Sequence, residues 1–217
     1  MTNQELFSYV DHTLLKPEAI PEQIAALCAE AAEHGTASVC VNGSYVALAK
    51  KLLDGKAKVC AVIGFPLGAM STAAKAFEAA EAIRDGADEI DMVIHIGQLK
   101  AGNTDYVLED IKAVKAAIGD HILKVIIETC LLTEEEKITM CRLVTESGAE
   151  YIKTSTGFST GGATFDDVRL FAEHVGEGVK IKAAGGIRSR EDMEEFLRLG
   201  ASRLGTSSAV KILCGKN

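Results

Sequence analysis

Several features that would assign a chain to a membrane or to nucleic acid are missing from these 217 residues. No apolar run approaches the roughly 18 residues of a transmembrane helix, so we expect no membrane partner. The first residues lack the basic start and apolar stretch of a secretion signal, so we expect a cytoplasmic protein. The net charge of −8 and the pI near 5.2 disfavour a nucleic-acid surface.

The six cysteines form no CxxC pair. A disulfide framework or a zinc site needs closer or more regular spacing, so we expect reduced thiols. His95 is a possible metal ligand, but no second histidine or carboxylate stands at ligand spacing on the same predicted element. We therefore expect neither a metal nor an organic cofactor.

Linkers rich in proline, glycine or serine are also absent, and 47% of the residues are hydrophobic. The length fits one domain with a sizeable core. We therefore predict a single domain over residues 1–217.

Short β-branched runs alternate along the chain with longer amphipathic stretches. The runs predict eight strands, at residues 8–13, 37–41, 58–63, 88–93, 123–128, 150–154, 179–183 and 202–206. The amphipathic stretches predict helices that include residues 21–34, 71–85, 106–118, 133–147 and 190–199.

Repeated strand–helix units indicate right-handed crossovers and a parallel sheet. Eight such units in 217 residues predict an α/β fold, a compact (β/α)8 TIM barrel. A doubly wound open sheet is the alternative. It is disfavoured because no GxGxxG motif follows the first predicted strand.

Two lysines, Lys153 and Lys182, stand at matching points of the sixth and seventh predicted strands. An unpaired ammonium group is costly in such apolar runs. If both side chains point inward, repulsion lowers the pKa of one lysine toward neutral pH and makes it nucleophilic. A second ammonium about 5 Å away supplies roughly 3 of the about 4 to 5 kcal/mol required. The structural alternative is that both lysines extend to the barrel mouth, or that Lys182 pairs with a carboxylate.

Other polar residues stand near predicted strand ends. Asp91 interrupts the fourth strand, where it could be a counter-ion for a lysine, move protons through a water, or do both. Residues 184–188 and 205–208 follow the seventh and eighth strands, the usual phosphate site of such barrels, although a tight turn would explain either one alone. The cluster at Asp11 and Thr13 is a site or a strand cap, and Cys40 fits a buried inert thiol.

Seven segments resemble the deoxyribose-phosphate aldolase family. The sixth and seventh strands contribute KTSTG and KAAGGIR, which together are highly specific. The segments span the chain in order, at residues 10–15, 38–41, 89–93, 124–129, 151–158, 182–188 and 205–208.

This resemblance implies a class I, metal-independent aldolase on a TIM barrel. Such an enzyme reversibly cleaves 2-deoxy-D-ribose 5-phosphate to D-glyceraldehyde 3-phosphate and acetaldehyde in deoxyribose catabolism. The resemblance makes Lys153 the Schiff-base lysine, Lys182 its pKa-lowering neighbour and Asp91 the proton-transfer carboxylate. It assigns pocket positions to Asp11, Thr13 and Cys40, and phosphate-binding positions to Gly157, Gly185, Gly186, Gly205, Ser207 and Ser208. It also implies phosphosugar and aldehyde substrates and a homo-oligomer, either a dimer or a tetramer.

The chain departs from the family pattern in two places. Many members end in a tail that closes with a tyrosine proposed to shuttle a proton, whereas this sequence has no tyrosine after Tyr151. Either water protonates the enamine or the chain is shortened, and we expect less than the full rate. Phe158 stands where some members carry lysine, which implies one phosphate contact fewer.

Two other functions compete with the aldolase. An isomerase or epimerase of phosphosugars would use the same phosphate loops with a carboxylate base, but it leaves the lysine pair unexplained. A barrel that binds a phosphosugar without catalysis is the third alternative.

Overall fold

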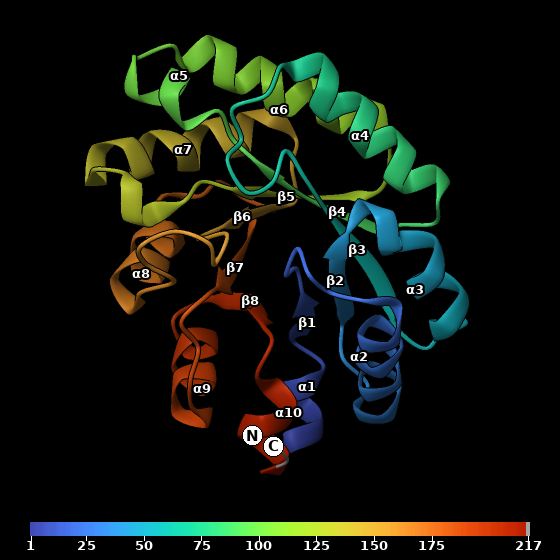
Figure 1. The fold of residues 1–217 in the computed structure, drawn as a ribbon. Coiled ribbons are helices and arrows are strands. Elements are labelled where there is room, and N and C mark those ends of the chain that lie inside the picture. Colours follow the sequence, from blue (N-terminus) through green and yellow to red (C-terminus); the bar gives the residue numbers. More distant parts are fainter. Residues whose placement is uncertain (216–217) are drawn as a thin grey trace.

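The computed structural model describes residues 1–215, and in it eight parallel strands close into a barrel (Figure 1). Each strand pairs with the next along the chain, and β8 pairs with β1. The strands are β1 (Val10–Leu14), β2 (Ser38–Asn42), β3 (Lys58–Ile63), β4 (Glu89–Val93), β5 (Ile122–Ile126), β6 (Tyr151–Lys153), β7 (Lys180–Ala184) and β8 (Ala201–Thr206). The predicted TIM barrel is confirmed, and its closure excludes the open doubly wound sheet.

Helices surround the barrel, as Figure 1 shows. They are α1 (Asn3–Phe7), α2 (Pro21–His34), α3 (Val46–Leu53), α4 (Thr72–Arg84), α5 (Ile96–Lys100), α6 (Thr104–Ile118), α7 (Glu134–Ser147), α8 (Phe165–His174), α9 (Arg190–Arg198) and α10 (Ala209–Cys214). Two short 3-10 turns, η1 (Gly43–Tyr45) and η2 (Thr129–Leu131), follow β2 and β5. Among the helices of residues 1–215, none combines the length and hydropathy needed to span a bilayer.

Local signals in the sequence set the ends of several helices. Helices α7 and α9 each begin with a capping box, on Thr133 and Ser189, which the short motifs at these positions encode. Gly35 and Gly148 close α2 and α7 in the left-handed conformation, with φ of 69° and 81°. Helices α1, α3, α5 and α8 were not singled out from the sequence. Three of these four have eight residues or fewer, too few for a clear amphipathic period.

The core has two parts that differ in character. Outward-facing strand residues such as Val39, Ile90 and Val125 pack with the helices in one large apolar cluster. Inside the barrel, a small apolar group of Leu15, Cys40, Cys60 and Val62 sits beside buried charged side chains. The interior layer is therefore largely ionic, and it is where the functional groups gather.

Candidate active site

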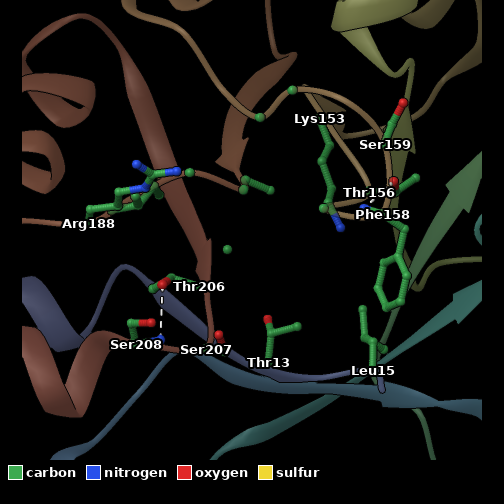
Figure 2. Close-up of a pocket in the computed structure, with 18 of the residues that line it drawn as sticks. Thr13, Leu15, Lys153, Thr156, Phe158, Ser159, Arg188, Thr206, Ser207 and Ser208 are labelled. Carbon is green, nitrogen blue, oxygen red and sulfur yellow. Dashed lines mark hydrogen bonds between the residues drawn. The ribbon is translucent and has the colours of Figure 1, made fainter. Parts of the chain in front are cut away.

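A cavity of about 640 Å³ opens at the carboxyl ends of the strands (Figure 2). Its walls come from four segments: residues 13–16, Lys153 with 156–162, 184–188, and 205–208. These segments follow β1, β6, β7 and β8, where barrel enzymes place their active sites. Figure 2 shows Lys153 on one side of the cavity and Ser207 and Ser208 on the other.

Neighbouring strands bring Lys153 and Lys182 together. The two residues are direct partners in the β6–β7 register. Lys153 is 3% exposed and lines the cavity, whereas Lys182 is fully buried and does not reach it. Both side chains point into the barrel, where they meet Asp91, so the condition set for the lysine pair is met.

Asp91 on β4 bridges the two lysines. Its Oδ2 lies 2.7 Å from Nζ of Lys153 and 2.7 Å from Nζ of Lys182. Its Oδ1 accepts a hydrogen bond from Nζ of Lys124 at 3.0 Å. Burial works to raise the pKa of Asp91, but Lys124, Lys153 and Lys182 outweigh it and hold that pKa well below the usual range. The counter-ion role considered for Asp91 is therefore present.

Lys182 also pairs with Asp11 on β1, through a short contact. Burial alone would lower the pKa of Lys182, but the carboxylates of Asp11 and Asp91 raise it above its ordinary value. The ammonium of Lys182 therefore persists at neutral pH. The arrangement combines two alternatives considered above, because Lys182 is at once a neighbour of Lys153 and a carboxylate partner.

A third lysine and an arginine complete this ionic layer, and neither was selected from the sequence. Nζ of Lys124 lies 2.5 Å from Oε2 of Glu89, and Arg203 contacts both Glu89 at 3.1 Å and Asp11 at 2.6 Å. Coulombic attraction outweighs burial and keeps the pKa values of Lys124 and Arg203 above the ordinary range. Lys124 carries the same signal that identified Lys153, a lysine inside an apolar strand.

The basic side chains of this ionic layer differ in how many carboxylates they contact. Lys124, Lys182 and Arg203 each contact two or more carboxylates, shared among Asp11, Glu89 and Asp91. Among the carboxylates of residues 1–215, Lys153 contacts Asp91 alone, and it shares the Oδ2 atom of Asp91 with Lys182. Of the basic side chains in this layer, Lys153 is therefore the one with the fewest carboxylate partners, and it is the one that reaches the cavity.

The assigned pocket residues lie at different depths. Thr13 lines the cavity, and its hydroxyl donates to the carbonyl of Asp11 at 2.8 Å. Asp11 and Cys40 are fully buried and do not line it. A direct contact of either residue with substrate stays a prediction.

Two thiols approach Asp91 from β2 and β3. Sγ of Cys60 lies 3.1 Å from Oδ1 of Asp91, and Sγ of Cys40 lies 4.0 Å from Oδ2. A hydrogen bond from Cys60 lowers the pKa of Cys40, while burial raises that of Cys60. Cys40, Cys60 and Asp91 could offer ligand atoms to a metal ion. Both oxygens of Asp91 already accept hydrogen bonds from lysines, however, so the carboxylate is engaged.

All six residues assigned to phosphate binding line the cavity: Gly157, Gly185, Gly186, Gly205, Ser207 and Ser208. Gly157, Gly185 and Gly186 have φ values of 83°, 78° and 75°, which favour glycine. A Cβ on Gly205 would lie 2.9 Å from Cβ of Ala184 and 3.1 Å from Cε of Lys182. Glycine at this position therefore leaves room for the buried lysine.

Two cationic residues in the cavity wall were not selected from the sequence. Lys16 and Arg188 both line the cavity, and Figure 2 places Arg188 on the side of Thr206 and Ser208. Helix α10 after β8 has only six residues, so loop amides, hydroxyls and these cations are the groups suited to an anion.

A closed barrel of eight parallel strands, with its cavity at their carboxyl ends, defines the class of (β/α)8 barrel enzymes. The chain belongs to the DeoC/LacD family of aldolases, whose model matches residues 6–217. The resemblance described from the sequence is thereby confirmed.

Individual relatives agree over nearly the full length. A deoxyribose-phosphate aldolase of Streptococcus suis is 59% identical over 212 residues, covering 97% of this chain and 96% of the relative. The crystal structure of a putative deoxyribose-phosphate aldolase from Coccidioides immitis has a TM-score of 0.96 at 42% identity, covering 99% and 87% of the two chains. A deoxyribose phosphate aldolase from Aeropyrum pernix, described as a unique tetramer, has a TM-score of 0.89 at 32% identity, covering 99% and 92%.

Proposed function

We propose that this chain is a class I aldolase that reversibly cleaves 2-deoxy-D-ribose 5-phosphate to D-glyceraldehyde 3-phosphate and acetaldehyde through an imine on Lys153. One observation carries the proposal. Of the three lysines that contact Asp91, only Lys153 reaches the cavity of the described chain, and it has no carboxylate to itself. The names of the relatives support the same reaction.

The first step forms the imine. The neutral amine of Lys153 adds to C1 of the open-chain sugar, and loss of water from the carbinolamine gives an iminium ion. The neighbouring cation Lys182 disfavours a second positive charge and so favours the neutral amine. Asp11 and Asp91 keep Lys182 charged while this happens.

The second step breaks the C2–C3 bond. The C3 hydroxyl loses its proton through a water to Asp91, and the electron pair of the C2–C3 bond moves into the iminium to give an enamine. While Lys153 is an ammonium, Asp91 is a weak base because three lysines hold its pKa down. The iminium ion keeps the positive charge on the Lys153 nitrogen until the C2–C3 bond breaks. The electron pair then neutralises that nitrogen, so Asp91 loses part of its stabilisation and becomes more basic as it takes up the proton.

The last step releases the products. D-glyceraldehyde 3-phosphate leaves, and C2 of the enamine takes up a proton from water. Hydrolysis of the resulting imine then frees acetaldehyde and returns Lys153. The same steps in reverse give the condensation.

The phosphate group would bind opposite the lysine. The loops at Gly185–Gly186 and Ser207–Ser208 line the cavity, with Arg188 on the side of Ser208. The Gly157 turn lies against the first of these loops, because a Cβ on Gly185 would lie 3.6 Å from Cα of Gly157. Backbone amides and hydroxyls in such glycine-rich loops suit phosphate oxygens. An isomerase or epimerase would use the same loops but gives no role to the buried lysines, so it is not favoured.

Borohydride trapping tests the proposal. The protein is treated with 2-deoxyribose 5-phosphate and borohydride, and its peptides are mapped by mass spectrometry. We expect a reduced adduct on Lys153 and none in the Lys153→Ala variant. A folded protein that binds the phosphosugar but gives no adduct would favour the isomerase or epimerase instead.

We also propose that the protein acts as a homo-oligomer, dimeric or tetrameric, on small phosphosugars and aldehydes in the cytoplasm, without nucleic-acid or membrane partners. The tetramer described for the Aeropyrum pernix relative supports an oligomer. Light scattering coupled to size exclusion would show it, and a monomer at micromolar concentration would contradict it.

A further inference from the structure

Glu128 has an unusual backbone for its residue type. It is one of two non-glycine residues with positive φ among residues 1–215, with φ of 56° and ψ of 66°. This left-handed conformation is costly for a side chain with a Cβ, and such strain clusters at functional sites. The other such residue, Asp54, is an exposed cap of α3.

The strain comes from an irregularity where β5 ends beside β6. The amide of Ile127 donates to the carbonyl of Lys153 at 3.1 Å, and that of Thr129 donates to Thr154 at 2.9 Å. The two amides are two residues apart in the chain after β5, but the carbonyls that they contact belong to consecutive residues after β6. The segment after β5 therefore contains one extra residue, Glu128. Bulges of this kind occur at barrel rims, where they redirect a side chain.

The redirected carboxylate holds the turn that follows the catalytic lysine. Oε1 of Glu128 accepts from the amide of Thr156 at 3.2 Å, and Oε2 accepts from the Thr156 hydroxyl at 2.5 Å. The same hydroxyl accepts from the amide of Phe158 at 3.0 Å. Gly157 is therefore enclosed in a turn fixed at both ends.

Glu128 is 2% exposed and has no ion pair among the described residues. Burying a carboxylate without a cation is unfavourable, so its hydrogen bonds to Thr156 must be well made. Glu128 does not line the cavity, whereas Thr156, Gly157 and Phe158 do. Its influence on a ligand must pass through that turn.

We propose that Glu128 is a positioning residue that holds the 156–158 turn in the conformation that receives the substrate phosphate. This rests on the proposed function, because it assumes that Gly157 faces the phosphate. The inference predicts that Glu128 matters for phosphorylated substrates and little for the bond-breaking step.

Steady-state kinetics of Glu128→Gln test it, with 2-deoxyribose 5-phosphate and unphosphorylated 2-deoxyribose as substrates. Glutamine keeps the size but loses one acceptor oxygen. We expect KM for the phosphorylated sugar to rise about tenfold with kcat within about twofold. For 2-deoxyribose, kcat/KM should stay within about twofold of the parent value.

Two further variants make the test specific. Thr156→Val removes the hydroxyl at constant shape, and in the double variant with Glu128→Gln the two KM effects should not add. Glu150→Gln is the matched control, because Glu150 ties β5 to β6 at the opposite end through the amide of Leu123 at 2.8 Å. It should leave KM within about twofold of the parent value.

The outcomes separate the two proposals. If the parent protein does not cleave 2-deoxyribose 5-phosphate, the proposed function fails. If it does, and Glu128→Gln keeps the parent KM or lowers kcat/KM equally for both substrates, the positioning role is wrong. If Glu128→Gln does not fold, Thr156→Val alone must still show the KM effect confined to the phosphorylated sugar.

Discussion

Nζ of Lys153 lies 2.7 Å from Oδ2 of Asp91, and this is the one ion pair of that lysine within residues 1–215. The same oxygen accepts a hydrogen bond from Lys182 at 2.7 Å. One carboxylate oxygen thus serves two buried lysines, and of these two side chains Lys153 is the one that lines the cavity.

Replacing Lys153 by alanine should abolish turnover and leave the fold intact. The nucleophile is lost, so we expect kcat to fall at least about a thousandfold. Asp91 keeps Lys124 and Lys182 as partners, so the unfolding free energy should change by no more than about 2 kcal/mol. A coupled assay of glyceraldehyde 3-phosphate release and a thermal melt measure both. Activity like that of the parent would eliminate the imine mechanism.

Replacing Lys182 by leucine should move the pH dependence upward. Loss of the neighbouring cation should raise the pH at which the imine forms, so the acidic limb of the kcat/KM profile should move to higher pH by about one to two units. Lys180→Leu is the control, because Lys180 lies at the exposed start of β7. Overlapping profiles for the parent and Lys182→Leu would show that the two lysines are not coupled.

Acid should destabilise the protein through the buried carboxylates. The folded-state pKa values of Asp11 and Asp91 are lowered, so their contribution to stability is present above the unfolded-state value of about 4 and is lost as the pH falls toward the folded-state values. Urea unfolding between pH 7 and pH 2 should show a falling free energy below about pH 4.

The Asp11→Asn variant checks the origin of that loss. It should be less stable at pH 7 by about 3 to 5 kcal/mol, because Lys182 and Arg203 each lose a buried partner. Its stability should then decline less steeply in acid. A slope equal to the parent slope would place the acid sensitivity elsewhere.

Replacing Gly205 by alanine should impair the site by crowding. The new methyl group would press on Ala184 and on Cε of Lys182, so we expect about 1 to 3 kcal/mol of destabilisation and a lower kcat/KM. Gly43→Ala is the control, because its Cβ would meet nothing within 4 Å. Equal stability and activity in the two variants would mean that the cavity tolerates the methyl group.

Much of the fold could be predicted because its signals are local. The β3 and α2 bounds agree with the predicted ranges, and the caps at Thr133 and Ser189 follow from short motifs. Residues 127–128 were predicted as strand but leave the sheet, because Glu128 forms the bulge beside β6. The hydrophobic pattern alone does not reveal a bulge with a left-handed residue.

The candidate site also has features that could be predicted from the sequence and features that could not. The matching positions of Lys153 and Lys182 on adjacent strands could be predicted, and they are register partners. Their inward orientation was a condition that only the barrel settled. The sequence could not show that Asp11, from β1, closes against Lys182 from β7, since barrel closure brings the first and last strands together. Arg203 and Glu89 joined the same layer for the same reason.

The sequence by itself determined the eight strand–helix units, the matching positions of the two lysines and the glycine-rich strand ends, because each depends on side-chain period or on backbone conformation within a few residues. Only the tertiary structure decided how the charges pair. Coulomb energy depends on distances between side chains from β1, β4, β5, β6, β7 and β8, and barrel closure sets those distances. That closure leaves Lys153 with a single shared carboxylate and an open path to the cavity.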